Sequence, residues 1–451
     1  MESKKLHIAL SVLANVCRFM LAVVFVFSGF VKANDPLGFQ YKLGDYLQAF
    51  GMLGWFPEWV LMIATVALAT LEFMLGVYLF FGINRRFTSW LVVLLMGVMT
   101  PLTLYLALEN PVSDCGCFGD AVILTNWQTF WKNVVLSIAA VIVLCLRKRM
   151  FRVVTPRSEW LVSVNTLLYI IILSYYSLSN LPVFDFRPYR IGASIPQGME
   201  IPEGAQMPVF ETLFIMEKEG QRQEFSLDNY PDSTWTFVDR KTVIKEAGYE
   251  PPIHDFSLLR MADGEDITDL VLADSGYTFL MVAHQLEKAD DSYSDLLNEL
   301  YDYCREHDYA FYGLTASNEE VVGQWLDRTG GEYPFCNVDD ITLKTMVRSN
   351  PGLMLLKGGV VLNKWANENI PDEYQLTAPL ELLPLAQGHV QGKGVKIATC
   401  ILWFVFPLLL ISLLDRIYFY YRRNRLARLL GDRQRMNENE EENNINPLIK
   451  D

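Results

Sequence analysis

The stretch LHIALSVLANVCRFMLAVVFVFSGFV (Leu6–Val31) opens the chain with an apolar run that contains a single charged side chain, Arg18. A helix of about 20 such residues crosses the hydrocarbon core of a bilayer. The run is too long for a signal peptide, and no small-residue cleavage site follows it, so we expect it to be retained as a span. Five later runs share this character: Trp59–Ile83, Phe87–Leu108, Trp127–Leu146, Trp160–Asn180 and Val395–Leu414.

The composition of the 451-residue chain also indicates a membrane protein with a soluble part. Hydrophobic residues make up 51% of it, which is high for a soluble protein but leaves room for a polar domain. The formal net charge of −14 argues against a nucleic acid partner, which would favour a basic face. Seven cysteines are too few for a disulfide-stabilised scaffold in a chain of this length.

The distribution of lysine and arginine predicts how the chain crosses the membrane. Basic residues cluster before the first run, between the second and third, between the fourth and fifth, and after the sixth. The link from Glu109 to Asn126 has none. Because positive charge is enriched on the cytoplasmic side, both termini are expected in the cytoplasm, and this link and residues 181–394 outside it.

The predicted organisation is a membrane α-helical bundle joined to a soluble α/β domain. Six segments are expected: a four-helix membrane domain (1–150), a fifth transmembrane helix (151–180), an extracytoplasmic β-rich segment (181–250), an α/β domain (251–390), a sixth transmembrane helix (391–425) and a disordered cytoplasmic tail (426–451). In the β-rich segment, a turn at Glu219-Gly220 predicts a hairpin. The acidic, Asn-rich tail has too few apolar residues to build a core.

From Pro251 onward, predicted strands and helices alternate, and the last two strands surround a Gly-Gly turn in NPGLMLLKGGVVLNKW (Asn350–Trp365). This order resembles the thioredoxin fold of the peroxiredoxin and thiol-reductase type, over residues 251–370. The resemblance implies a cis peptide bond at Asn350-Pro351. It also implies a dithiol after the strand Tyr277–Ala283, where this chain has no cysteine and His284 follows instead.

Two further cysteines lie in this predicted domain. Cys304 falls in the middle of a predicted helix and is expected to be a buried packing residue. Cys336 is expected in a loop, where it is a weak candidate for a partner thiol. Classical disulfide exchange is excluded at the vacated dithiol position, because exchange requires a thiolate there.

Cys115 and Cys117 in SDCGCFGD (Ser113–Asp120) are the candidate catalytic dithiol. No metal is expected, because two thiolates without further Cys or His ligands fall short of a tetrahedral set. A ring closed over one residue removes little chain entropy, which disfavours a structural crosslink. Such a small ring favours a labile disulfide that exchanges in an oxidising compartment. A working dithiol is therefore predicted, with a static disulfide or packed thiols as the open alternative.

Arg18 and Glu72 are the ionisable side chains nearest the middle of their spans, and an isolated charge is costly there. Counted at about 1.5 Å per residue, the two lie at matched depth on consecutive antiparallel helices. A buried Arg18–Glu72 ion pair is therefore predicted. It either fixes helix packing or forms a polar site for a quinone headgroup or a proton.

Three motifs of the membrane part resemble the DoxX-like superfamily and especially its MauE-type branch: FSGFVKANDP (Phe27–Pro36), LEFMLGVYLFFG (Leu71–Gly82) and DCGCFGD (Asp114–Asp120). The resemblance covers residues 6–150. It implies a bacterial inner membrane location and a role in thiol–disulfide or quinone-linked electron transfer, as in the maturation of a disulfide-rich methylamine dehydrogenase subunit. Quinone is then the candidate cofactor.

Two functions remain open at this stage. The first is an oxidoreductase component that assists the maturation of extracytoplasmic proteins, with the lipid bilayer and a thiol-containing protein as its partners. The second is a non-enzymatic, membrane-anchored binding scaffold whose thioredoxin-like domain is redox-inert. The behaviour of Cys115 and Cys117 separates the two.

Overall fold

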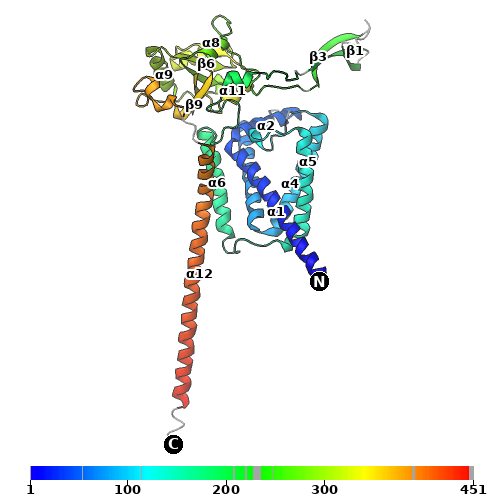
Figure 1. The fold of residues 1–451 in the computed structure, drawn as a ribbon, viewed down its shortest axis with the longest axis vertical. Helices are drawn as coiled ribbons and strands as arrows, with labels where there is room; N and C mark the ends of the chain where they lie inside the picture. Colours follow the sequence, from blue (N-terminus) through cyan, green and yellow to red (C-terminus); the bar gives the residue numbers. More distant parts are fainter. Residues whose placement is uncertain are drawn as a thin grey trace. The chain divides into compact units, whose positions relative to one another are not determined.

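The computed structural model describes residues 2–52, 54–112, 114–206, 209–218, 221–226, 235–246, 248–388 and 392–445. The chain divides into two compact units, and Figure 1 shows the elements of both. The first unit comprises Met1–Phe184 and Gln391–Asp451, and the second comprises Asp185–Val390. The β-rich segment and the α/β domain that were expected separately thus fall in one unit.

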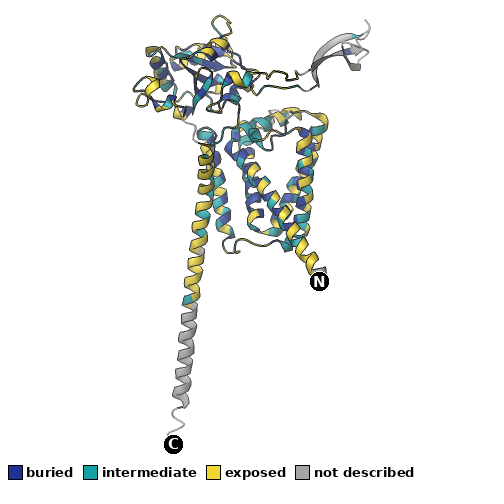
Figure 2. Cartoon of the chain, viewed as in Figure 1, coloured by how far each residue is buried: buried dark blue, intermediate teal, exposed yellow. Residues whose placement is uncertain are grey.

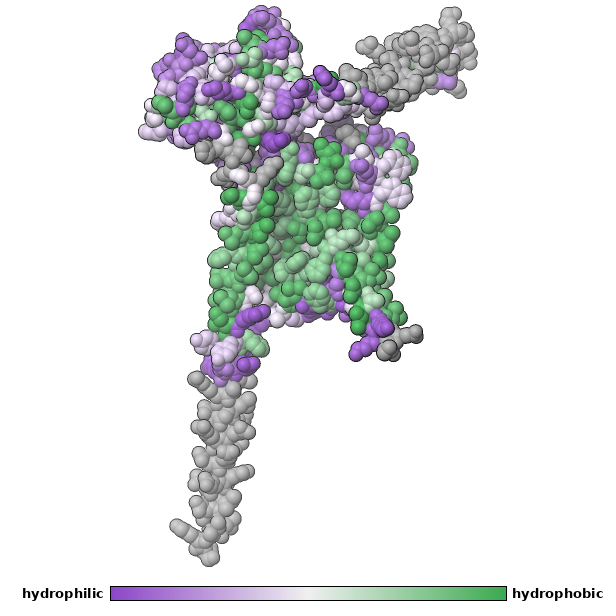
Figure 3. Space-filling model, in the orientation of Figure 1, coloured by the Kyte–Doolittle hydropathy of each residue, from purple (hydrophilic) through white to green (hydrophobic). Residues whose placement is uncertain are grey.

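Among its described residues, the first unit has six helices long and apolar enough to cross a membrane, as predicted. They are α1 (Glu2–Asn34), α3 (Glu58–Phe81), α4 (Arg85–Glu109), α5 (Asn126–Cys145), α6 (Glu159–Ser179) and α12 (Lys393–Ile445). On the face shown in Figure 3, apolar side chains form a broad band over the bundle. We call the end of the bundle where α4 ends and α5 begins the disulfide end.

One helix of this unit was not predicted. Helix α2 (Pro36–Ala49) follows α1 directly and runs across the disulfide end of the bundle (Figure 1). Asp35 caps it by accepting the backbone N–H of Gly38 at 3.0 Å, and Pro36 occupies its first turn. Both residues are typical of a helix N-terminus.

Helices α1 and α3 pack closely because glycine replaces larger side chains where they meet. A Cβ atom added at Gly29 would lie 2.4 Å from the backbone nitrogen of Phe73. One added at Gly76 would lie 2.5 Å from the backbone nitrogen of Val26. Small residues let helix backbones approach closely in a membrane, and this approach places polar groups of the two helices in contact.

Helix α12 extends beyond its predicted span. The tail after residue 425 was expected to be disordered, but the helix continues to Ile445, and its apolar part is largely exposed along its length (Figure 2). Poor apolar content predicts the absence of a core rather than the absence of a helix. Arg, Leu, Met and Glu are good helix formers, and the next proline is Pro447.

The second unit contains a six-stranded mixed sheet with the order β4-β7-β6-β5-β8-β9. The strands are β4 (Leu259–Arg260), β5 (Tyr277–Ala283), β6 (Ala310–Thr315), β7 (Phe335–Asn337), β8 (Gly352–Lys357) and β9 (Val360–Ala366). The helices of this region are α8 (Thr268–Ala273), α9 (Ser294–Glu306), α10 (Glu319–Thr329) and α11 (Asp340–Met346), with the short α7 (Ile195–Met199) earlier in the chain.

The arrangement of this sheet is thioredoxin-like, as expected. Strands β5 and β6 are parallel and connected through α9, and β8 and β9 form an antiparallel pair beside β5. The Asn350-Pro351 peptide bond is cis and precedes β8, whose Gly352 pairs with Val282 at the end of β5. Strand β4 is short, and a single bridge connects its Leu259 to Asp266.

A separate three-stranded antiparallel sheet has the order β2-β1-β3. It consists of β1 (Val209–Lys218), β2 (Gln221–Ser226) and β3 (Thr236–Glu246). The pairing of β1 with β2 confirms the predicted hairpin, although its turn at Glu219-Gly220 lies outside the described residues. The sequence reading did not include β3, which pairs along most of β1.

Candidate dithiol site

Cys115 and Cys117 form a disulfide in the link between α4 and α5, with their Cα atoms 5.5 Å apart. Gly116 between them has a φ of +61°, a conformation that glycine adopts without steric cost. Its N–H donates to Oδ1 of Asp114 at 2.7 Å. The link thus forms a tight turn that brings the two sulfur atoms together.

Helix α2 holds this turn from one side. The ammonium group of Lys42 lies 2.8 Å from Oδ2 of Asp114, and the hydroxyl of Tyr46 donates to the backbone oxygen of Cys115 at 2.7 Å. Burial raises the pKa of Tyr46, and the negative charges of Asp114 and Asp45 act in the same direction. Tyr46 therefore remains a protonated donor. Because Lys42 pairs with Asp114, the carboxylate next to the disulfide is already compensated.

Helices α1 and α3 hold the turn from within the bundle. Nζ of Lys32 donates to Oε2 of Glu72 at 2.7 Å, to Oγ of Ser28 at 2.7 Å and to the backbone oxygen of Cys117 at 2.9 Å. An ammonium group has three protons, and all three are used. Lys32 is 3% exposed and Glu72 is 6% exposed, so this ion pair is buried directly against the disulfide turn.

Ser28 completes the cluster. Its hydroxyl oxygen lies 2.8 Å from Oε2 of Glu72 and 2.8 Å from the backbone oxygen of Cys117. One hydroxyl proton can serve one of these acceptors at a time, so the serine can shift its hydrogen bond between the carboxylate and the turn. Residues from two helices and one loop thereby share a single polar cluster.

The predicted Arg18–Glu72 ion pair is wrong. The guanidinium group of Arg18 donates to the backbone oxygen of Phe151 at 2.6 Å and to that of Phe80 at 3.5 Å. It also lies over the rings of Phe19 and Phe151. Glu72 binds Lys32 instead.

The error arises from the estimated depth of Arg18. A Cβ atom at Gly82 would lie 3.2 Å from Nη1 of Arg18, which places the arginine level with the end of α3. Glu72 lies ten residues earlier on α3, about 15 Å along the helix axis. The prediction measured the depth of Arg18 from Leu6 and the depth of Glu72 from the end of α3. Because α1 begins at Glu2, these two starting points do not lie at the same depth.

The two sulfur-bearing residues differ in accessibility. Cys115 is 5% exposed, whereas Cys117 is partly exposed. The adjacent Phe118 packs against Phe27 of α1, with ring centroids 5.3 Å apart, and Nζ of Lys132 lies 4.1 Å from the centroid of the Phe118 ring. A reacting group approaching the turn therefore reaches Cys117 before Cys115.

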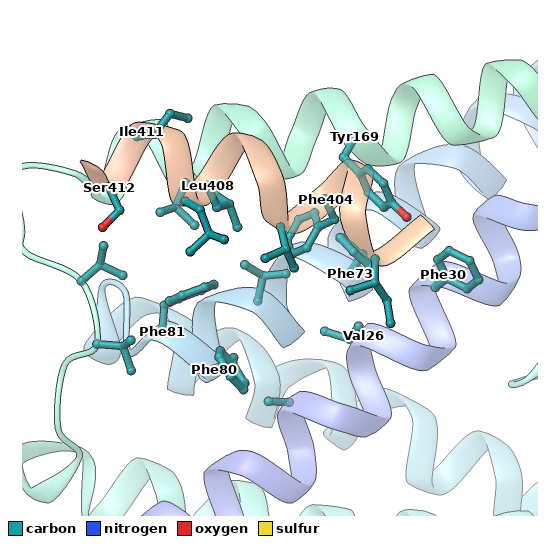
Figure 4. A pocket seen from close by; sticks show the side chains of 18 of the residues that line it. Val26, Phe30, Phe73, Phe80, Phe81, Tyr169, Phe404, Leu408, Ile411 and Ser412 are labelled. Atoms are coloured by element: carbon teal, nitrogen blue, oxygen red, sulfur yellow. The ribbon is translucent and has the colours of Figure 1, made fainter. Parts of the chain in front are cut away.

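The same unit contains a large apolar cavity of about 890 Å³ between α1, α3, α6 and α12. Figure 4 shows Phe30, Phe80 and Phe81 among the side chains that line it, and Phe73 packed against Phe404 of α12. Its polar lining groups gather where α6 begins and α12 leaves the bundle, away from the disulfide end: Thr155, Ser158, Ser412 and Arg416. At the other end, the hydroxyl of Tyr169 donates to the backbone oxygen of Cys400 at 3.3 Å.

The thioredoxin-like part lacks an accessible thiol in its described residues. His284 directly follows β5, as expected, and is partly exposed. Cys304 is fully buried in α9, where burial raises its pKa, so its role as a packing residue is confirmed. Cys336 was expected in a loop but lies buried in β7, and burial raises its pKa to about 11. A buried thiol of this kind is unreactive.

The remaining cysteines lie along the bundle helices. Cys17 is buried in α1, Cys145 is exposed at the end of α5, and Cys400 is partly exposed in α12. Within the described parts of the chain, no group of three or more His, Cys, Asp or Glu side chains could hold a metal ion.

The sequence reading missed Ser28, Lys32, Lys42 and Tyr46 at this site. Ser28 and Lys32 stand four residues apart within the quoted FSGFVKANDP motif, a spacing that places both on one face of a helix. That spacing, together with a lysine at the end of an apolar span, was a usable signal. Lys42 and Tyr46 carried no comparable signal, because α2 itself was not predicted.

Solved structures similar to the chain cover its thioredoxin-like part. A putative protein disulfide isomerase from Bacteroides thetaiotaomicron is 17% identical over 26% of this chain and 76% of its own, with a TM-score of 0.21. StoA from Bacillus subtilis is 16% identical over 24% and 84%, with a TM-score of 0.20. A putative thioredoxin from Neisseria meningitidis is 15% identical over 31% and 93%, with a TM-score of 0.24.

Family models match two further parts of the chain, while a search of curated proteins found no match. A domain of unknown function matches residues 210–247, which include most of the three-stranded sheet. The model of the methylamine utilisation protein MauE matches residues 10–146. The membrane region that carries the disulfide and its buried ion pair is therefore similar to MauE.

Proposed function

We propose that this protein is a membrane component of cell-envelope thiol–disulfide exchange, with Cys115 and Cys117 as its exchanging pair. The observation that carries the proposal is the disulfide closed over Gly116 with one accessible partner, in a MauE-like bundle. The turn is held by side chains of α1 and α2, so its backbone stays in place when the sulfur–sulfur bond opens. A purely static crosslink over one residue would contribute little to stability.

The proposed location is a bacterial inner membrane, with both termini in the cytoplasm. The absence of Lys and Arg between Glu109 and Asn126 supports this orientation. If all six helices cross the membrane, three crossings precede the disulfide link and five precede residues 185–390. Both parts then lie on the extracytoplasmic side, where disulfides persist.

The exchange step uses a protein dithiol as the partner. A partner thiolate attacks Sγ of Cys117, the Cys115–Cys117 bond breaks, and its electron pair leaves with the sulfur of Cys115, which then takes up a proton. A second partner thiolate attacks the mixed disulfide and releases Cys117 as a thiolate. The partner is oxidised to a disulfide, and the Cys115–Cys117 pair is reduced to two thiols.

Repeated turnover requires a second oxidant, and a quinone is the candidate class. The apolar cavity fits an isoprenoid or acyl chain, because aromatic and aliphatic side chains line most of it. Most of its polar groups lie at the end away from the disulfide, and at the other end the hydroxyl of Tyr169 already donates to the backbone oxygen of Cys400, so the lining does not fit a quinone headgroup placed near Cys117.

The unequal exposure of the two cysteines makes the test specific. In a Cys115→Ser variant, the accessible Cys117 thiolate can attack the disulfide of the oxidised partner, the reverse of the second step, and this opens the partner's disulfide to a mixed disulfide and a free partner thiol. The chain then has no resolving thiol, so the mixed disulfide should be trapped. In a Cys117→Ser variant, the buried Cys115 should trap several-fold less. The measurement is non-reducing electrophoresis of alkylated membranes followed by mass spectrometry, with Cys145→Ser as a matched control.

The second candidate function is a binding scaffold. It is favoured by the thioredoxin-like part, whose described cysteines, Cys304 and Cys336, are both buried. Absence of trapped partners in both serine variants, together with full function of the Cys115→Ser/Cys117→Ser double variant in cells, would establish the scaffold and contradict exchange.

A further inference from the structure

The ammonium group of Lys32 is fixed against the backbone of Cys117. It donates to the Cys117 oxygen at 2.9 Å, and Glu72 and Ser28 accept its other two protons. The side chain is 3% exposed, so water screens its charge only weakly. With three anchoring partners, the charge cannot turn away when the chemical state of Cys117 changes.

We propose that Lys32 is a positioning residue that stabilises the Cys117 thiolate, and that Glu72 limits how much of this charge acts on the sulfur. The inference rests on the proposed exchange function and adds a group that tunes it. In the proposed direction, a nearby fixed cation stabilises Cys117 as the thiolate that leaves the mixed disulfide. In the opposite direction, where the Cys117 thiolate is the nucleophile, the same cation increases its reactive fraction at neutral pH.

The inference accounts for the arrangement of the buried charges. A lysine placed only to pair with Glu72 would need no contact with the loop, and a lysine placed only to hold the loop would need no buried carboxylate. The observed cluster joins both contacts through one nitrogen atom. Glu72 offsets the cost of burying the ammonium.

Other charged or titratable groups face the turn from each neighbouring element. Lys42 and Tyr46 come from α2, Lys132 comes from α5 and lies over the Phe118 ring, and Asp114 and Asp120 belong to the turn itself. These groups are the same in every variant of the test below. Differences between variants therefore report Lys32 and Glu72.

The test measures the pKa of the Cys117 thiol in the full-length protein. In a Cys115→Ser background, the rate of alkylation by iodoacetamide is followed against pH, and the peptide that contains Cys117 is quantified by mass spectrometry. Lys32→Met should raise this pKa by about one to two units, the range typical of a nearby opposite charge. Glu72→Gln should lower it by about one unit, because the remaining ammonium is no longer offset. Lys32→Arg should stay near the parent value.

Opposite signs separate this role from a structural one. A merely structural contact would make both variants loosen the turn and change alkylation in the same direction. Shifts of equal sign, or no shift in Lys32→Met, would overturn the inference. The variant Lys32→Met/Glu72→Gln leaves no lone buried charge, so comparing it with Glu72→Gln isolates the ammonium even if Lys32→Met does not fold.

The two proposals fail in different ways. Trapped partners together with an unshifted Cys117 pKa would contradict the role of Lys32 and leave exchange standing. The expected order of pKa values without any trapped partner would contradict the exchange function and leave the electrostatic coupling standing.

Discussion

Buried ion pairs stabilise the thioredoxin-like part as well as the membrane part. Asp185 accepts from Lys364 at 2.8 Å and from Nε of Arg187 at 2.8 Å. The linker after α6 is thereby attached to β9. Backbone hydrogen bonds continue the contact: Gly192 N–H donates to the oxygen of Val361, and Val361 N–H donates to the oxygen of Ala193. Burial alone would raise the pKa of Asp185, but the charges of Lys364 and Arg187 outweigh it and hold the pKa below its usual range.

This lowered pKa predicts an acid-sensitive attachment. A carboxylate with a depressed folded-state pKa contributes stability above its unfolded pKa of about 3.9, and the contribution is lost as the pH falls below that value. Hydrogen exchange of the peptide that spans β9 should therefore increase from about pH 4 downward, after correction for the intrinsic exchange rate. In Asp185→Asn this increase of exchange at low pH, the acid step, should disappear. Strand β9 should already be less protected from exchange at neutral pH. An unchanged acid step in Asp185→Asn would contradict the assignment.

Among the secondary-structure elements, α1 and α3 determine the site. Gly29 and Gly76 allow the close contact through which Lys32 reaches Glu72. Gly29→Ala should therefore lower the free energy of unfolding by about 1–3 kcal/mol through overpacking. It should also shift the pKa of the Cys117 thiol, because the ion pair would separate.

The matched control is Gly97→Ala in α4, where an added Cβ meets no atom within 4 Å. Its effect on the free energy of unfolding should stay within about 0.5 kcal/mol or be favourable, since alanine is the better helix former. The measurement for both variants is denaturant unfolding in one detergent. Equal losses in the two variants would show that the contact between α1 and α3 does not limit stability.

At this scale the sequence predicted more of the fold than of the site. Six apolar runs gave all six long helices, because spanning length and hydropathy are local properties. The cis Asn350-Pro351 bond followed from the resemblance to thioredoxin. The partner of Glu72 did not follow, because it depends on how far α1 extends past α3, and this offset is set by packing. Helix α2 was missed although Asp35 and Pro36 mark its start.

Across the whole molecule, the order of the membrane-spanning helices determines which compartment each loop enters, and therefore the redox conditions around its cysteines. Crossing the membrane six times would place Cys117 and Cys145 on opposite sides, since one α5 helix separates them. The expected compartments differ in redox state, so the Cys115–Cys117 disulfide would persist on one side while Cys145 stayed reduced on the other. The long α12 would return the chain to the side of the N-terminus.

Native cysteines allow this topology to be tested without new labels. In intact cells, a membrane-impermeant maleimide should modify Cys117 only after mild reduction, because the disulfide blocks it beforehand. Cys145 should be modified only after the membrane is permeabilised, and it then needs no reductant, because it is an exposed free thiol at the end of α5. Peptide mass spectrometry distinguishes the two sites, and Cys145→Ser controls for background. Modification of Cys145 in intact cells would reverse the orientation, and it would place the disulfide in the reducing compartment, where the proposed exchange could not operate.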